Sequence, residues 1–166
     1  MDLFDSLRTI LAAMTPIGEL RLAIPLAILE MDMRWYQALP LALVGNMIPP
    51  LFLAPGLEPA YRLFQRFPGP LGRALNRLFT WRVDRLRTAW GERFRKYGPA
   101  ALVILVAIPL PLTGAWTGSL AAWVFQIPPK RALPLIALGV LIAGVVVTAL
   151  TVSGTHIGVF LANSSD

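Results

Sequence analysis

The sequence predicts an all-helical membrane protein with two inverted repeats, each made of a re-entrant broken hairpin and a spanning helix. Residues 35–57, 97–129 and 132–165 carry no charge. A bilayer core about 30 Å thick needs about 20 apolar helical residues to cross it. The chain is 56% hydrophobic and 14% charged, whereas soluble domains carry about 25% charged residues. We therefore expect one integral membrane domain over residues 1–166.

The first repeat is expected over residues 6–57 and opens with two short apolar arms, 7–14 and 22–29. Neither arm spans a membrane at a rise of 1.5 Å per residue. The unit is therefore either one kinked spanning helix or a re-entrant hairpin, and its broken backbone must be shielded from lipid. Residues 37–57 predict a spanning helix that is kinked or partly unwound after Gly45, because prolines follow.

The second repeat is expected over residues 98–162 and has the same order of elements. Its arms are residues 100–108 and 115–125, and residues 132–151 predict a spanning helix that residues 152–162 either extend or leave. Proline and glycine mark the tips of both broken units: Pro16 and Gly18 in the first, and Pro109, Pro111 and Gly114 in the second.

A short sequence recurrence supports the comparison of the two halves. Ala38-Leu-Pro-Leu41 recurs as Ala132-Leu-Pro-Leu135, with Gly45 and Gly139 at the same distance beyond each. The order of broken unit, polar turn and Ala-Leu-Pro-Leu helix therefore occurs twice, which indicates a structural repeat.

Basic residues concentrate between the two halves. Ten of the 15 lie from Arg62 to Lys96, where Asp84 and Glu92 are the only acidic residues. In a chain with long apolar runs, such a block marks the cytoplasmic side rather than a nucleic-acid surface. Residues 59–97 predict a basic amphipathic linker helix on the membrane surface; the alternative is a cytoplasmic loop that packs on the bundle.

The charges also bear on topology. If each broken unit is a re-entrant hairpin, the arginine block and Lys130-Arg131 both lie in the cytoplasm, as the positive-inside rule requires. Four plain crossings would instead leave Lys130-Arg131 outside. The rule favours hairpins in a multi-pass protein of the inner membrane, with two inverted halves.

Glu19 and Arg21 are the strongest candidate site residues. They flank the first break, and a charge at the bilayer centre costs about 2.5–3.5 kcal/mol unless it faces a partner or a wet cavity. They form either a substrate or proton site, with Glu19 titrating and Arg21 holding an anion, or an ion pair that fixes a hinge.

The second tip is polar but uncharged. Thr113, Trp116 and Thr117 are its candidate binding residues, and the arm that begins at residue 115 offers unpaired N–H groups that favour an anion. Trp116 can equally serve packing. Asn46, in the middle of the first spanning helix, either caps a kink or binds substrate.

No catalytic or cofactor chemistry is predicted. The chain has no cysteine, and it contains no phosphate-binding loop, metal-ligand cluster or hydrolase triad. We therefore expect neither an enzyme, nor a cofactor, nor a metal site.

Four segments resemble the bacterial and archaeal family of putative small multidrug export proteins. They are Thr15-Pro-Ile-Gly-Glu-Leu-Arg-Leu-Ala-Ile-Pro25, Gly45-Asn-Met-Ile-Pro-Pro50, Ala107-Ile-Pro-Leu-Pro-Leu-Thr-Gly-Ala-Trp-Thr-Gly118 and Gly139-Val-Leu-Ile-Ala-Gly144. The resemblance covers nearly the whole chain and implies drug efflux.

The paired broken units also look like the DedA family, which is implicated in moving polyprenyl-phosphate or phospholipid across bilayers. Glu19 and Arg21 match the acidic and basic roles in that family's tips loosely, and the second tip here lacks an arginine.

Three functions follow from these observations. The first is an exporter of small molecules, with Glu19 as the proton-coupling residue. The second is a translocase of a lipid phosphate, with Arg21 holding the phosphate. The third is a membrane scaffold that binds acidic lipid or protein through the arginine block. The expected partners are the lipid bilayer, the small-molecule or lipid-phosphate substrate and a second copy in a homodimer; nucleic acid is not expected.

Overall fold

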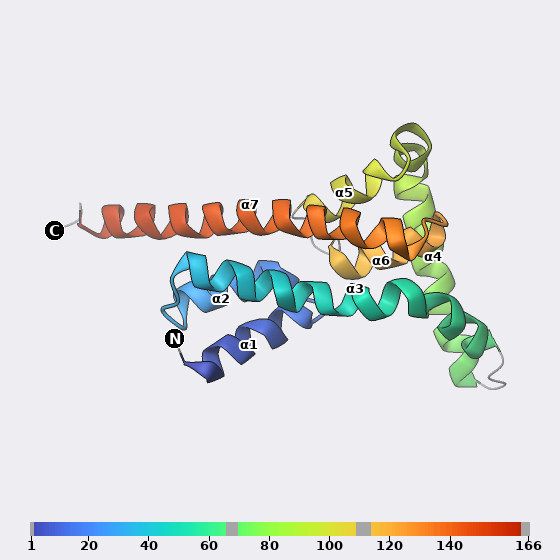
Figure 1. Cartoon of the computed structure of the whole chain (residues 1–166), viewed down its shortest axis with the longest axis horizontal. Coiled ribbons are helices and arrows are strands. Elements are labelled where there is room, and N and C mark those ends of the chain that lie inside the picture. Colours follow the sequence, from blue (N-terminus) through green and yellow to red (C-terminus); the bar gives the residue numbers. More distant parts are fainter. Residues whose placement is uncertain (1, 66–69, 109–113, 164–166) are drawn as a thin grey trace.

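The computed structural model describes residues 2–65, 70–108 and 114–163, and its elements in that part of the chain are all helices (Figure 1). In chain order they are α1 (Leu3–Met14), α2 (Glu19–Leu29), α3 (Trp35–Gln65), α4 (Pro70–Tyr97), α5 (Ala100–Ala107), α6 (Ala115–Val124) and α7 (Pro129–Asn163).

Both predicted breaks are present, and each begins at the residue before a proline. Thr15, which directly follows α1, and Ile108, which directly follows α5, have extended backbones with ψ angles of 143° and 119°. A following proline disfavours the helical conformation of the residue before it, so neither helix continues through that residue. The chain reverses at each break, and α1 lies against α2 as α5 lies against α6.

The helices α3 and α7 run side by side in opposite directions (Figure 1). The first spanning helix was expected to end at residue 57 and to be either kinked or partly unwound after Gly45. The end at residue 57 and the unwinding are wrong, because α3 is continuous to Gln65 with Pro49 and Pro50 inside it. The carbonyls that lose a helical donor at those prolines belong to Gly45 and Asn46, which are both buried. Residues 152–162 extend α7, which ends at Asn163.

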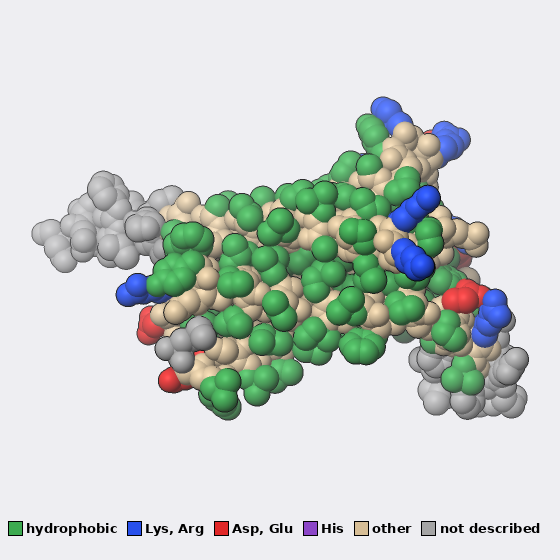
Figure 2. All heavy atoms as spheres, viewed as in Figure 1, with side chains coloured by type: hydrophobic (Ala, Val, Ile, Leu, Met, Phe, Trp, Pro, Cys, Tyr) green, Lys and Arg blue, Asp and Glu red, His purple; other side chains and the backbone are tan. Residues whose placement is uncertain are grey.

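Within the part of the chain that the structure describes, two stretches are long and apolar enough to cross a membrane, Trp35–Leu63 and Pro129–Gly154. They belong to α3 and α7. Figure 2 shows hydrophobic side chains over the middle of the molecule, whereas most of the charged side chains in this view lie toward its two ends.

Corresponding glycines make corresponding contacts in the two halves. A Cβ atom on Gly45 of α3 would lie 2.5 Å from the Ile10 carbonyl oxygen of α1, and one on Gly139 of α7 would lie 2.6 Å from the Val106 Cβ of α5. Each long helix therefore touches the first arm of its own hairpin at the glycine that follows the Ala-Leu-Pro-Leu segment.

The basic segment is a helix, α4, which crosses one end of the bundle (Figure 1). Its Val83, Leu86 and Phe94 are buried against the bundle, while most of its arginines are exposed. The helix contacts α3, α5 and α6. The amphipathic pattern thus predicted a helix that is present, but the predicted range of 59–97 is wrong at its start, because residues 59–65 belong to α3. The buried apolar residues of α4 pack on the protein rather than on a membrane surface.

Substituting Gly45 with alanine should destabilise the protein, because the added methyl group overlaps the backbone of α1. Overpacking of this kind costs about 1–3 kcal/mol. Circular dichroism of the detergent-solubilised protein during heating measures the unfolding temperature, which should fall. Gly56→Ala is the matched control in the same helix, since a Cβ there meets nothing within 4 Å. The control should be neutral or slightly stabilising, and equal effects at both positions would contradict the assigned contact.

Candidate functional site

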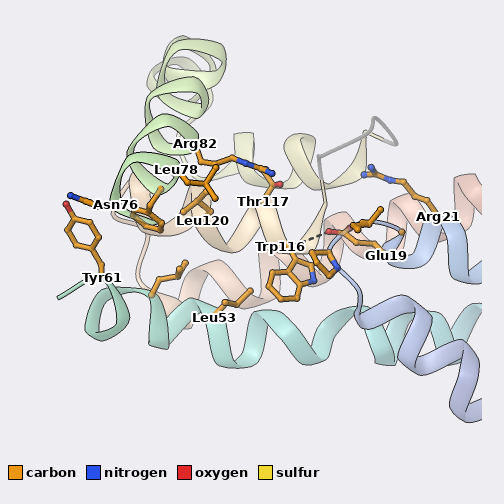
Figure 3. Close-up of a pocket in the computed structure, with 15 residues that line it drawn as sticks. Glu19, Arg21, Leu53, Tyr61, Asn76, Leu78, Arg82, Trp116, Thr117 and Leu120 are labelled. Carbon is orange, nitrogen blue, oxygen red and sulfur yellow. Dashed lines mark hydrogen bonds between the residues drawn. The ribbon is translucent and has the colours of Figure 1, made fainter. Parts of the chain in front are cut away.

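Glu19 joins the two hairpins. It begins α2, and its side chain is only 6% exposed. Its carboxylate accepts a hydrogen bond from the backbone N–H of Ala115 at 3.2 Å. It accepts a second from the backbone N–H of Trp116 at 3.3 Å (Figure 3). These N–H groups belong to the first turn of α6, where helix geometry leaves donors without intrahelical partners and the helix dipole favours a negative charge.

Gly114 makes this approach possible. Its φ of 147° and ψ of −158° lie in a region that only glycine populates readily. A Cβ atom at this position would also overlap the Glu19 carboxylate oxygens. On the opposite side of the contact, Glu19 itself has a positive φ of 49°, which is uncommon for a residue with a side chain. Both backbones are therefore constrained where the hairpins meet.

Arg21 makes the complementary contact with the other arm of the second hairpin. Its Nη2 donates to the Ile108 carbonyl oxygen at 3.1 Å, at the C-terminal end of α5. A cation is favoured at a helix C-terminus, just as an anion is at an N-terminus. Glu19 therefore binds the N-terminus of α6, and Arg21 binds the C-terminus of α5, so each charge meets the helix end of opposite sign. The two side chains also attract each other.

Trp116 makes a contact in the opposite direction. Its indole Nε1 donates to the Met14 carbonyl oxygen at 3.1 Å, in the last turn of α1. This carbonyl is among those that a helix C-terminus leaves without an intrahelical partner. Each hairpin thus satisfies backbone groups that the break in the other has exposed.

Asn46 of α3 is fully buried close to this junction. Its amide lies within interaction range of the Glu19 carboxylate, but neither its Nδ2 nor its Oδ1 meets hydrogen-bond geometry with a described partner. Asn46 therefore lies beside the buried carboxylate, as part of the same polar cluster.

A cavity of about 490 Å³ extends from the hairpin tips to α4 (Figure 3). Charged side chains line it at both ends, Glu19 and Arg21 at the tips and Arg82 on α4, with leucines and aromatic rings between them. Its full lining is Pro16, Ile17, Gly18, Glu19, Arg21, Leu53, Leu57, Tyr61, Asn76, Leu78, Phe79, Arg82, Trp116, Thr117 and Leu120.

An aromatic cluster borders the cavity on the α4 side. The rings of Tyr61, Phe79 and Trp123 lie with their centroids 5.2–5.3 Å apart, and they come from α3, α4 and α6. The Trp123 indole also donates to Glu58 at 2.8 Å. Offset and edge-on packing of this kind fixes the relative position of the three helices.

The structure brings together most of the site residues that the sequence predicted. Glu19, Arg21, Trp116 and Thr117 line one cavity together with the tip residues Pro16 and Gly18, and Asn46 and Gly114 lie against Glu19. The predicted tip residues Pro109, Pro111 and Thr113 lie outside the described residues.

Sequence reasoning missed the α3 and α4 side of the cavity. Tyr61 and Arg82 lie far from both tips in the sequence, and Arg82 extends from α4 toward Thr117 (Figure 3). The amphipathic pattern placed Arg82 among many similar arginines, so no local signal distinguished it. Only the crossing of α4 over the bundle brings it to the cavity.

The fold and the site define a class of helical membrane protein with a ligand-sized cavity between two broken hairpins. Residues 19–146 match the family described as putative small multi-drug export protein. The match covers most of the chain, which therefore belongs to this family. No curated protein and no solved structure matches the chain.

Gly114→Ala should disrupt the junction more than Gly98→Ala. Both glycines have positive φ angles, but only the alanine at 114 would also overlap the Glu19 carboxylate. Backbone strain alone costs about 1–3 kcal/mol, and the overlap adds the loss of two hydrogen bonds to a charged group at about 1.5–3 kcal/mol each. Thermal unfolding in detergent measures the difference. Equal losses of stability would show that the contact between Glu19 and α6 contributes nothing.

Proposed function

We propose that this protein is a multi-pass transporter of the inner membrane that exports small amphiphilic molecules through the cavity at the hairpin junction. The observation that carries the proposal is the cavity itself. It is large enough for a ligand, it is mostly apolar, and it ends at a buried carboxylate within the apolar middle of the molecule. Substrate sites of transporters lie where broken helices meet near the membrane midplane.

In the proposed topology both hairpins are re-entrant and the two halves are inverted repeats. The arms of 12, 11, 8 and 10 residues are each too short to cross a bilayer. The contacts between the tips shield broken backbone from lipid, as a re-entrant hairpin requires. The matching contacts of Gly45 and Gly139 support the repeat. The positive-inside rule then assigns the α4 end to the cytoplasm.

In the proposed mechanism, protonation of Glu19 couples transport to a proton gradient. The ionised carboxylate holds the N-terminus of α6, with Arg21 as its charged neighbour and Asn46 beside it. A protonated carboxyl group has no negative charge for those N–H groups to bind, so the contact between the tips weakens. Substrate in the cavity and the proton then favour different arrangements of the two hairpins.

A specific observation favours a lipid phosphate as a second candidate substrate, as in the DedA-like alternative. Arg21 and Arg82 line the same cavity, with apolar side chains between them. Guanidinium groups bind phosphate through paired hydrogen bonds, and the apolar lining suits an acyl or prenyl chain. In this alternative the arginines bind the head group in turn as it crosses.

Glu19→Gln should abolish proton-driven transport. Glutamine keeps the size of the side chain but cannot carry the charge that changes during the proposed cycle. The measurement is pH-gradient-driven movement of ethidium in liposomes that contain the purified protein. Glu30→Gln is the matched control, because it removes a carboxylate from the end of the same helix, away from the cavity. Transport by Glu19→Gln at the rate of the unsubstituted protein would contradict proton coupling through this residue.

Arg82→Gln should distinguish the two candidate substrates. If the substrate is a lipid phosphate, this variant should slow the movement of fluorescent phosphatidylglycerol between leaflets, measured by dithionite quenching, at least tenfold, as about 1.4 kcal/mol of lost binding would do. Arg87→Gln, an exposed arginine of α4 that does not line the cavity, is the control. If the unsubstituted protein transports ethidium but moves the lipid no faster than empty liposomes do, the lipid candidate is excluded.

A further inference from the structure

A second cavity, of about 430 Å³, lies at the arginine-rich end of the molecule. It is formed by the C-terminal part of α4, the turn into α5 and the turn from α6 into α7. Its lining is Gly91, Phe94, Arg95, Gly98, Pro99, Phe125, Gln126, Ile127, Pro128 and Arg131. It shares no lining residue with the cavity at the hairpin junction. We propose that it binds the head group of an anionic phospholipid.

The charges of this cavity are suited to an anion. Arg95 of α4 and Arg131 of α7 line it from two different helices. Glu92 lies 3.8 Å from Arg95 with both side chains largely exposed, and an exposed pair of this kind interacts weakly. α7 begins at Pro129, so the positive end of its helix dipole lies beside the 126–128 turn that borders the cavity and favours an anion there.

An apolar wall lies beside these charges. Phe94 and Phe125 stack with their ring centroids 3.9 Å apart and nearly parallel planes. Phe94 is only 7% exposed, and Ile127 and Pro128 continue the apolar lining. A phosphate group with glycerol and acyl carbons attached matches this combination, whereas a free anion uses only the arginines.

The place of the cavity in the fold favours a lipid over a soluble anion. It lies where α7, a helix long enough to span a membrane, begins. α4 crosses the bundle at the same end. Basic pockets between helices at the membrane surface bind acidic head groups. A lipid held there would join the C-terminal part of α4 to the start of α7.

Lipid titration followed by native mass spectrometry of the full-length protein in detergent tests the proposal. Dioleoyl phosphatidylglycerol should bind about 30-fold more tightly than dioleoyl phosphatidylcholine, as two arginines near a membrane surface predict. The double variant Arg95→Gln/Arg131→Gln should lose this preference. The double variant Arg85→Gln/Arg87→Gln removes the same charge from α4 outside the cavity, and it should keep the preference.

Further arms separate the alternative outcomes. Gly91→Leu should weaken phosphatidylglycerol binding without changing any charge, because a Cβ at Gly91 meets open space and the position lines the cavity. This variant keeps the proposal testable if the arginine double variant fails to fold. Equal losses in both arginine double variants would overturn the proposal in favour of a general basic surface. Complete displacement of the lipid by millimolar inorganic phosphate would also overturn it, in favour of a soluble-anion site.

Discussion

The contact between the two hairpin tips is the interaction on which the rest of the structure depends. A break in an apolar helix exposes backbone donors on one side and acceptors on the other, and lipid can satisfy neither. Here Glu19 receives the N–H groups at the start of α6, and Arg21 donates to the last carbonyl of α5. Trp116 donates back to the last turn of α1. Each hairpin therefore requires the other, and the buried charges are retained because helix ends of the opposite sign receive them.

This arrangement explains why the strained positions gather at one place. Gly114 adopts a conformation that other residues avoid, and Glu19 has a positive φ angle directly opposite it. Hydrogen bonds to a charged group contribute about 1.5–3 kcal/mol each, which is enough to offset strain of about 1–3 kcal/mol at such residues. Protonation of Glu19 would change this balance, as the proposed mechanism requires.

The long helices set the distance between the tips and α4. Gly45 and Gly139 let α3 and α7 approach the first arm of each hairpin closely, and the ring cluster of Tyr61, Phe79 and Trp123 connects α3, α4 and α6 at the far end. The junction cavity lies between these two sets of contacts. The long helices therefore pack closely against the hairpin arms, and the aromatic rings pack together at the α4 end. The junction cavity remains between these contacts, with a mostly apolar lining.

The sequence by itself determined the breaks, the apolar helices and the basic end of the molecule, because these follow from local rules. Proline stops the preceding residue from being helical, uncharged runs require burial in lipid or protein, and a periodic apolar face produces an amphipathic helix. The sequence also indicated that Glu19 and Arg21 need partners, since they are charged residues beside such a break. It could not show that their partners are the ends of α6 and α5, nor that α3 stays helical to Gln65, nor that Arg82 reaches the same cavity. Only the tertiary structure decided these points, because each depends on groups that are distant in the chain and that only the packing of the helices brings together.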